Sequence, residues 1–327
     1  MCWFIVTYSI AIRTLGRAGE KFRIELESIA AQTVQPEKVI VYIAEGYPRP
    51  EITVGKEEYV WVKKGMVAQR AIRYDEISSD CVLLLDDDVR LAPDSVEKLL
   101  MALEENDLDC VGADVFKNQE MPIAVKLKAA VSNWVFPHYD KRWAFKMRRT
   151  GAFSYNKNPE SHCYMSQSCG GPTMLWRKKA LLGTHLEDEM WMDNLSFSYG
   201  DDALISYKLF MNGGRLGVLY GSGVDNLDAG SFSSAFKKSP DRIHVIAKAN
   251  LMIWWRSIYR NGTDTFGSRF LAALCFGSKV IWQSVGMVVL SAMRLSPGIA
   301  LSFFRGIRDG VKSSRSEPFA ALPPYVR

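Results

Sequence analysis

The chain has 327 residues, of which 48% are hydrophobic and 24% charged, and its formal net charge is +5 at pH 7. These values exclude an intrinsically disordered chain, a collagen-like chain and a small disulfide scaffold. The charge is unevenly divided, since residues 237–327 hold 14 Lys/Arg against 4 Asp/Glu, whereas residues 1–236 hold 27 against 32. The sequence therefore consists of an acidic body and a basic, aromatic C-terminal region.

The first 115 residues alternate strand and helix patterns. Apolar, β-prone runs predict strands at 3–8, 39–43, 59–62, 81–85 and 109–115, and helical periodicity predicts helices at 19–32, at 66–77 and from Pro93 onward. Strands separated by helix-length segments imply βαβ units and a mainly parallel sheet. In such sheets ligands bind beyond the carboxyl ends of the strands.

The pattern weakens over residues 121–162, which are aromatic and basic, and then resumes. We expect a strand at 173–176, a helix at 201–212 ended by a Gly-Gly pair, and a strand at 215–220. The C-terminal region contains two long apolar segments, 243–259 and 270–293.

Segment 270–293 is close to the length of about 20 residues that spans a bilayer. It holds Lys279 as its single charge and is flanked by Arg269 and Arg294. These basic residues favour a helix lying on a membrane surface. A buried core helix and a true membrane span remain the alternatives.

The chain start and the cysteines indicate the compartment. The first residues lack the basic segment and the apolar length of a secretory signal. The six cysteines form no Cys-x-x-Cys pair, and Cys163 and Cys169 with His162 make only a weak metal pattern. We therefore expect reduced thiols and a cytoplasmic protein.

Three successive carboxylates, Asp86, Asp87 and Asp88, follow the apolar run 81–85. Such side chains repel one another, and their desolvation at the end of a buried strand is costly unless a cation or a ring of donors compensates. Asp86 and Asp88 share one side if the strand alternation continues, which suits Mg²⁺ or Mn²⁺. The alternative is a solvated acidic turn.

Seven segments, taken in chain order, resemble the family 2-like glycosyltransferases of GT-A fold over about residues 4–233. They are Ile5-Val6-Thr7-Tyr8, the helix end Leu26-Glu27-Ser28-Ile29-Ala30-Ala31-Gln32-Thr33, Pro36-Glu37-Lys38-Val39-Ile40-Val41, Gly65 with Ala68-Gln69-Arg70-Ala71, Leu85-Asp86-Asp87-Asp88, Gly170-Gly171 with Met174-Leu175-Trp176-Arg177, and Gly200-Asp201-Asp202-Ala203-Leu204-Ile205. Each segment is weak alone, and the common order makes the resemblance specific.

The resemblance implies an α/β, Rossmann-like GT-A domain over 1–236, with a donor half at about 1–115 and an acceptor half at about 116–236. The resemblance does not extend to residues 237–327, whose basic, aromatic composition predicts a helical region associated with an anionic membrane surface. The implied activity is inverting transfer of a single sugar from a nucleotide-diphosphate sugar to a hydroxyl of a glycan or lipid-linked glycan, in polysaccharide or cell-envelope synthesis. Processive relatives carry a late Gln-x-x-Arg-Trp motif and several spans, and neither is evident here.

The resemblance also assigns site residues. Donor-binding residues would be Thr7, Tyr8, Glu45, Gly65, Arg70, Asp86, Asp87, Gly170 and Gly171. Asp88 and Asp86 would hold Mn²⁺ or Mg²⁺, with Asp228 where the family often has a late His. Asp202, with Asp201 beside it, would be the general base. Without the resemblance, Arg70 reads equally as a solvated helix residue, Glu45 as a turn carboxylate, and the Asp pair as a helix cap.

Several positions depart from the family pattern. Ser9-Ile10 follows the Thr-Tyr pair, Glu45-Gly46 ends the second strand, and Ala71 replaces an Asn. A nucleotidyltransferase is one alternative, faintly supported by Thr14-Leu15-Gly16-Arg17. A haloacid-dehalogenase-type phosphatase is disfavoured because Arg90 occupies a required position. A non-enzymatic membrane-surface module stays open, and nucleic-acid binding is disfavoured by the acidic body.

Overall fold

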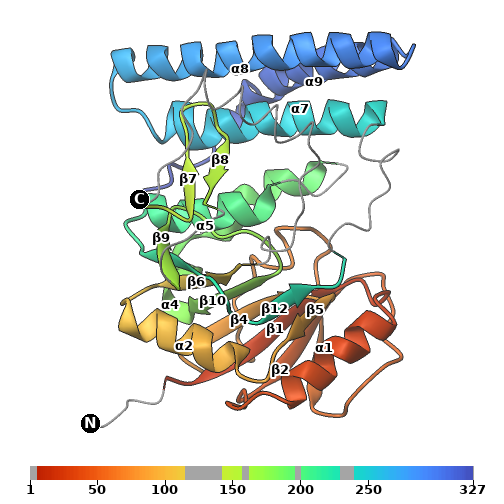
Figure 1. Cartoon of the computed structure of the whole chain (residues 1–327), viewed down its shortest axis with the longest axis vertical. Helices are drawn as coiled ribbons and strands as arrows, with labels where there is room; N and C mark the ends of the chain where they lie inside the picture. The colour runs from red at the N-terminus through yellow and green to blue at the C-terminus, as the bar shows by residue number, and fades with distance from the viewer. Residues whose placement is uncertain (1–5, 115–141, 157–161, 196–199, 229–238, 327) are drawn as a thin grey trace.

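The computed structural model describes residues 6–114, 142–156, 162–195, 200–228 and 239–326. Its centre is an eight-stranded sheet of order β3-β2-β1-β4-β10-β6-β11-β9 (Figure 1). The strands are β1 (Tyr8–Thr14), β2 (Val39–Ala44), β3 (Glu57–Val62), β4 (Cys81–Asp86), β6 (Cys110–Ala113), β9 (Cys163–Ser166), β10 (Thr173–Arg177) and β11 (Leu216–Leu219). Strands β9 and β10 run antiparallel to their neighbours, and the other strands point one way. The predicted mainly parallel sheet is therefore confirmed.

Both faces of the sheet are covered by apolar side chains. Because successive side chains of a strand point to opposite faces, Ile10 and Ile12 of β1 join one core and Ala11 joins the other. The first core is closed by α1 (Glu20–Ala30) and α2 (Ser95–Glu105). The second is closed by α4 (Lys178–Gly183), the 3-10 helix η1 (Leu186–Asn194) and α5 (Asp201–Met211).

The register of the central strands brings polar residues to one edge. In the parallel pair of β1 and β4, Arg13 lies opposite Asp86 at the carboxyl ends. The antiparallel strand β10 places Thr173 opposite Leu85, so the chain enters β10 beside Asp86. The backbone N–H of Asp86 donates to the Pro172 carbonyl over 3.0 Å. Gly171, with φ of 89°, adopts a backbone conformation that favours glycine just before this contact.

Two predicted elements differ in the structure. The first strand is Tyr8–Thr14 and not 3–8, because the apolar run continues through Ile10 and Ile12, and these side chains fill the core. Residues 1–5 lie outside the described part of the chain. The predicted helix 66–77 is a series of turns, in which Tyr74 has a positive φ of 54° that ends helical geometry.

Two small antiparallel sheets flank the centre, β5 (Val89–Leu91) with β12 (Val224–Asn226) and β7 (Phe145–Met147) with β8 (Phe153–Tyr155). The C-terminal region forms a helical layer on the far side of α5 from the central sheet (Figure 1). The layer contains α7 (Pro240–Trp254), the π-helix η2 (Trp255–Arg260), α8 (Phe266–Met293), α9 (Gly298–Ser314) and α10 (Glu317–Ala320). The domain boundary near residue 236 falls outside the described residues and stays a prediction.

Five cysteines lie in the described part of the chain, and all are free thiols: Cys81, Cys110, Cys163, Cys169 and Cys275. Cys110 and Cys169 face each other across the core with their Sγ atoms 3.9 Å apart. Burial raises the pKa of the Cys81 thiol to about 12, which keeps it protonated and unreactive.

Candidate active site

A buried cluster of charges lies at the carboxyl ends of β1 and β4. Arg13 pairs with Asp86 through two nitrogens, and its Nη1 lies 3.3 Å from Asp201 and donates to the Met66 carbonyl over 3.0 Å. Arg70 pairs with Asp86 and Asp201, each over 3.1 Å, and with Asp202. Two guanidinium groups thus face three carboxylates, which leaves one negative charge in excess.

The carboxylates of this cluster have different pKa values. Burial alone would raise the pKa of Asp86, but Arg13 and Arg70 outweigh it and lower the pKa to about 2. Burial raises the pKa of Asp202 to about 6; Arg70 opposes this shift, while Asp201 adds to it. Asp86 therefore stays ionised, and Asp202 titrates where a general base operates near neutral pH.

Helix α5 positions the Asp pair. Gly200, with φ of 74°, precedes the helix, and Asp201 and Asp202 occupy its first turn. Asp201 is buried, and the Asp202 side chain is 23% exposed. A helix N-terminus stabilises ionised carboxylates, yet here the carboxylates also pair with Arg70. Asp201 and Asp202 therefore join the helix to the strand edge and are more than a local helix cap.

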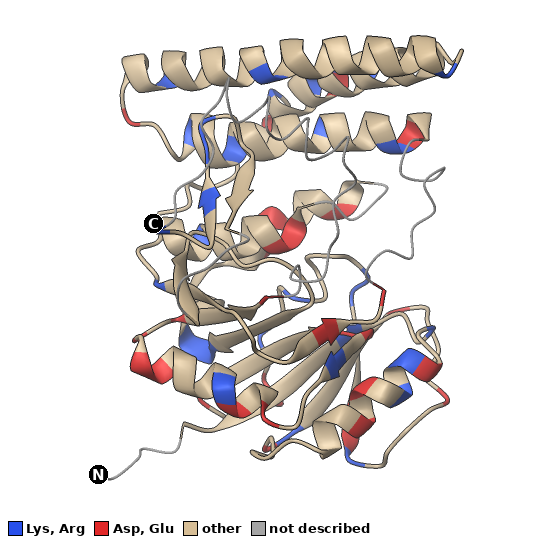
Figure 2. Ribbon diagram, in the orientation of Figure 1, with Lys and Arg blue, Asp and Glu red and all other residues tan. Residues whose placement is uncertain are grey.

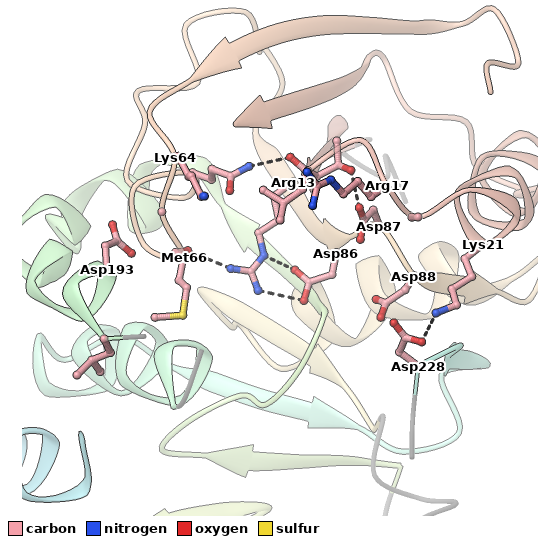
Figure 3. A pocket seen from close by; sticks show the side chains of 16 residues that line it. Arg13, Arg17, Lys21, Lys64, Met66, Asp86, Asp87, Asp88, Asp193 and Asp228 are labelled. Atoms are coloured by element: carbon pink, nitrogen blue, oxygen red, sulfur yellow. Dashed lines mark hydrogen bonds and ion pairs between the residues drawn. The ribbon is translucent and has the colours of Figure 1, made fainter. Parts of the chain in front are cut away.

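A cavity of about 740 Å³ opens beside this cluster (Figure 3). Its walls carry the cationic residues Arg13, Arg17, Lys21 and Lys64 and the carboxylates Asp86, Asp87, Asp88, Asp193 and Asp228. The volume is within the range of small-molecule sites. Asp202 does not line the cavity, and it is linked to the cavity wall through Arg70 and Asp86.

The three carboxylates of the acidic triplet have different contacts. Asp86 pairs with the arginines, and Asp87 accepts a hydrogen bond from the Thr14 hydroxyl. Asp88 Oδ1 is buried without a hydrogen-bond partner among the described residues. Burial, with Asp86, Asp87 and Asp228 nearby, raises the pKa of Asp88 to about 7.

Asp228 lies beside Asp88 and pairs with Lys21 (Figure 3). Among the described residues, no three His, Cys, Asp or Glu side chains converge as a preformed metal site. Asp86 instead pairs with Arg13 and Arg70, and its predicted role as a metal ligand stays a prediction. Asp88 and Asp228 remain as the adjacent carboxylate pair.

Gly65 begins a turn that borders the cavity. The turn is fixed by Asp193, whose carboxylate accepts the backbone N–H groups of Val67 over 2.8 Å and Ala68 over 3.0 Å. A Cβ at Gly65 would collide with this carboxylate. The turn also supplies Arg70 and the Met66 carbonyl that holds Arg13.

The structure brings most of the predicted site residues to this edge of the sheet. They are Gly65, Arg70, Asp86, Asp87, Asp88, Gly171, Asp201, Asp202 and Asp228, with Gly170 one residue before Gly171. Arg70 is buried and ion-paired, so the solvated alternative is wrong.

Three predicted residues are placed elsewhere. Thr7 and Tyr8 lie at the amino end of β1, where Thr7 bonds Asp80 and the Tyr8 hydroxyl donates to the Val34 carbonyl. Their assignment followed from beginning the strand too early. Glu45 follows β2, is exposed and is absent from the cavity wall.

Sequence reasoning missed Arg13, Thr14, Lys21 and Asp193. The signal for the first two was present, because Arg13 and Thr14 are the polar residues that end the apolar run Ile10 to Ile12. Asp193 carried no local signal, since it acts on backbone groups more than 120 positions away.

Comparison with known proteins assigns the family. The sequence model described as "Glycosyltransferase like family 2" matches residues 25–239, which is more than half of the chain. The protein is a family 2-like glycosyltransferase. The glycosyltransferase is 30% identical over 123 residues to the "Uncharacterized glycosyltransferase YwdF" of Bacillus subtilis (strain 168). That match covers 33% of this chain and 45% of the relative, so less than half of the relative's length is matched.

One solved structure supports the fold of the glycosyltransferase. The structure of S. aureus TarS 1–349 aligns with a TM-score of 0.54 and 11% identity, over 97% of this chain and 83% of that chain. A structure of GalNAc-T7 with UDP, GalNAc and Mn²⁺ aligns with a TM-score of 0.47 and 12% identity, over 77% of this chain and 51% of that chain. The GT-A fold is confirmed, and the family assignment favours sugar transfer over the nucleotidyltransferase and non-enzymatic alternatives.

Proposed function

We propose that this glycosyltransferase moves a single sugar from a nucleotide-diphosphate sugar to a hydroxyl of a glycan or lipid-linked glycan, with inversion at the anomeric carbon. The observation that carries the proposal is the charge cluster, because its contacts link Asp86 in the cavity wall to Asp202, the candidate base. Donor binding and proton removal would thus share one rigid group of side chains.

The cavity supplies the donor side. The cationic side chains of Arg17, Lys21 and Lys64 line the cavity, together with the ionised carboxylate of Asp86. Cationic side chains form strong, charge-assisted hydrogen bonds with phosphate oxygens. They would hold the diphosphate and stabilise the negative charge that grows on it as the bond to the sugar breaks.

Asp202 is proposed as the general base. It would take the proton of the acceptor hydroxyl while the hydroxyl oxygen bonds to the anomeric carbon and the nucleoside diphosphate leaves. The raised pKa of Asp202, about 6, supports this role because its carboxylate is ionised at neutral pH and still basic. One carboxylate base acting opposite the leaving group inverts the anomeric configuration.

Asp88 and Asp228 fit a divalent cation. Both are hard oxygen ligands, and Asp88 Oδ1 is a buried acceptor without a hydrogen-bond partner among the described residues. Mn²⁺ or Mg²⁺ held there would supply Lewis-acid stabilisation of the leaving diphosphate. Lys21, which pairs with Asp228, would contribute positive charge at the same place.

The decisive experiment is a thermal-shift screen of nucleotide sugars, each with Mn²⁺ and with EDTA. A donor at 100 times its Kd stabilises a protein by about 2.7 kcal/mol, so we expect one donor to raise Tm, and EDTA to reduce that shift. Asp88→Asn should abolish the metal-dependent part, whereas Asp94→Asn, whose side chain is 47% exposed and pairs with Lys98, should not. The product made from that donor should have the opposite anomeric configuration by NMR, and a retained configuration would contradict the inverting scheme.

We further propose a cytoplasmic location, which the free thiols of the described cysteines support. Sugar nucleotides and reduced thiols would then share one compartment. Cell fractionation measures this directly, and recovery of the protein from an oxidising compartment with Cys110 and Cys169 joined would contradict it.

A further inference from the structure

Helix α8 (Phe266–Met293) presents a wide apolar face to solvent. Among the described residues it is the one helix long and apolar enough to cross a membrane, and 6% of its most apolar 18-residue window is buried. The exposed side chains include Phe270, Leu274, Ile281, Val285 and Val288, of which Ile281 is 68% exposed. At 100° per residue these five positions fall on one side of the helix. The described part of the protein therefore does not enclose this segment.

The opposite side of α8 is held by the rest of the protein. Phe276 stacks on Trp254 with ring centroids 4.3 Å apart, and the Lys279 ammonium donates to the Thr150 carbonyl over 3.1 Å. Near the helix end, the Ser291 hydroxyl accepts the backbone N–H of Ala300 over 3.1 Å. Crossing a bilayer would break these contacts, so α8 is built to lie along a surface.

The charges around this face are mostly basic. Between residues 264 and 317 the sequence contains seven Lys/Arg and three acidic residues, Asp264, Asp309 and Glu317. Asp309 pairs with His244 and Arg308. Arg269 and Arg294, at the two ends of α8, are exposed. Figure 2 shows basic residues and almost no acidic ones over α8 and α9.

We propose that the outer face of α8, together with Leu301 and Phe304 of α9, docks on the surface of an anionic lipid bilayer. The outer face of α8 is apolar and lacks protein cover among the described residues, so it needs an apolar environment from outside. Anionic headgroups attract basic residues that lie at the surface. A second copy of the same face would instead bring like charges together, which disfavours a dimer. The inference does not depend on sugar transfer.

Vesicle co-sedimentation of the full-length protein tests the proposal. We expect binding to vesicles of phosphatidylcholine with phosphatidylglycerol and much weaker binding to phosphatidylcholine alone. The double variant Ile281→Glu with Val285→Glu should lose about tenfold or more of the binding, because it puts charges into the buried apolar face. Met101→Glu is the matched control, since Met101 is an exposed apolar residue on α2, and it should bind as the wild type does.

A second pair of variants tests the charge component. The double variant Arg269→Gln with Arg294→Gln should bind anionic vesicles more weakly, by roughly fivefold for each arginine. A higher salt concentration should also weaken the binding of the wild type to these vesicles. An unchanged Tm of the ligand-free variants would show that they fold.

Three outcomes would overturn the proposal. The first is that the Ile281→Glu/Val285→Glu variant binds vesicles as tightly as the wild type does. The second is that the wild type binds neither kind of vesicle. The third is that the wild type resists extraction from membranes by alkaline carbonate, which would show that it spans the bilayer. Light scattering could instead show that the wild type is a dimer without lipid, that the same variant is a monomer, and that neither binds vesicles. This result would assign the face to a second copy of the chain.

Discussion

Arg13 and Arg70 decide the character of the candidate site. Both contact Asp86, Asp201 and Asp202, although Arg13 comes only to 4.0 Å from Asp202. A buried carboxylate without such partners would be protonated or strongly destabilising. The two arginines therefore keep Asp86 ionised and leave Asp202, which has the weaker set of contacts, as the carboxylate that titrates.

Replacement of Asp202 by Asn should lower kcat by about 10² to 10⁴, the usual contribution of a general base. The wild-type kcat/KM should fall about tenfold per pH unit below pH 6, since the base is active only when ionised and its pKa is about 6. The variant should lack this acidic limb. Asp107→Asn, at a side chain that is 82% exposed, serves as the control, and an acidic limb preserved in Asp202→Asn would assign the base elsewhere.

The turn from Gly65 to Arg70 is the element that joins the two halves of the site. It carries Arg70 to the acidic cluster and presents the Met66 carbonyl to Arg13. Helical periodicity predicts a helix here, but Tyr74, with a positive φ of 54°, ends helical geometry and leaves a series of turns. Asp193 accepts the two N–H groups at the start of the segment and anchors it.

Asp193→Ala should loosen this turn. Two backbone N–H groups would lose a charged acceptor, which we expect to lower the free energy of unfolding by about 1–3 kcal/mol. The donor-induced thermal shift should decrease as well, because Arg70 and Arg13 lose their fixed positions. Denaturant unfolding of Asp193→Ala beside Asp75→Ala, whose side chain is 74% exposed, measures the effect. Equal stability of the two variants would contradict this role of Asp193.

At the scale of the whole molecule, the C-terminal helical layer is bound to the catalytic body by buried charges. Arg256 of η2 pairs with Glu189 of η1 over 2.7 Å and donates to the Pro323 carbonyl over 2.6 Å. Lys208 of α5 lies 3.2 Å from the same Glu189. Tyr325, near the chain end, is buried against Arg256. Helix α5 is therefore fixed near its C-terminal end by the same network that holds the helical layer.

Arg256→Met should destabilise the protein by about 3–5 kcal/mol, because it leaves the buried Glu189 with a weakened set of partners. The double variant with Glu189→Leu should recover much of this loss, since a buried pair replaced by apolar residues is often close to neutral. Urea unfolding of the single and double variants checks the expectation. A double variant less stable than Arg256→Met would show that packing, and not charge, dominates here.

Sequence alone determined the order of most strands and helices, the family resemblance and the acidic residues Asp86, Asp88 and Asp202. Those features are local, because apolar periodicity and short motifs extend over a few residues. The tertiary structure decided which charges meet, since Arg13 contacts Asp86 across 73 positions and Asp201 across 188. It also decided the exposure of α8, because the length and composition of segment 270–293 fit a core helix, a surface helix and a membrane span alike.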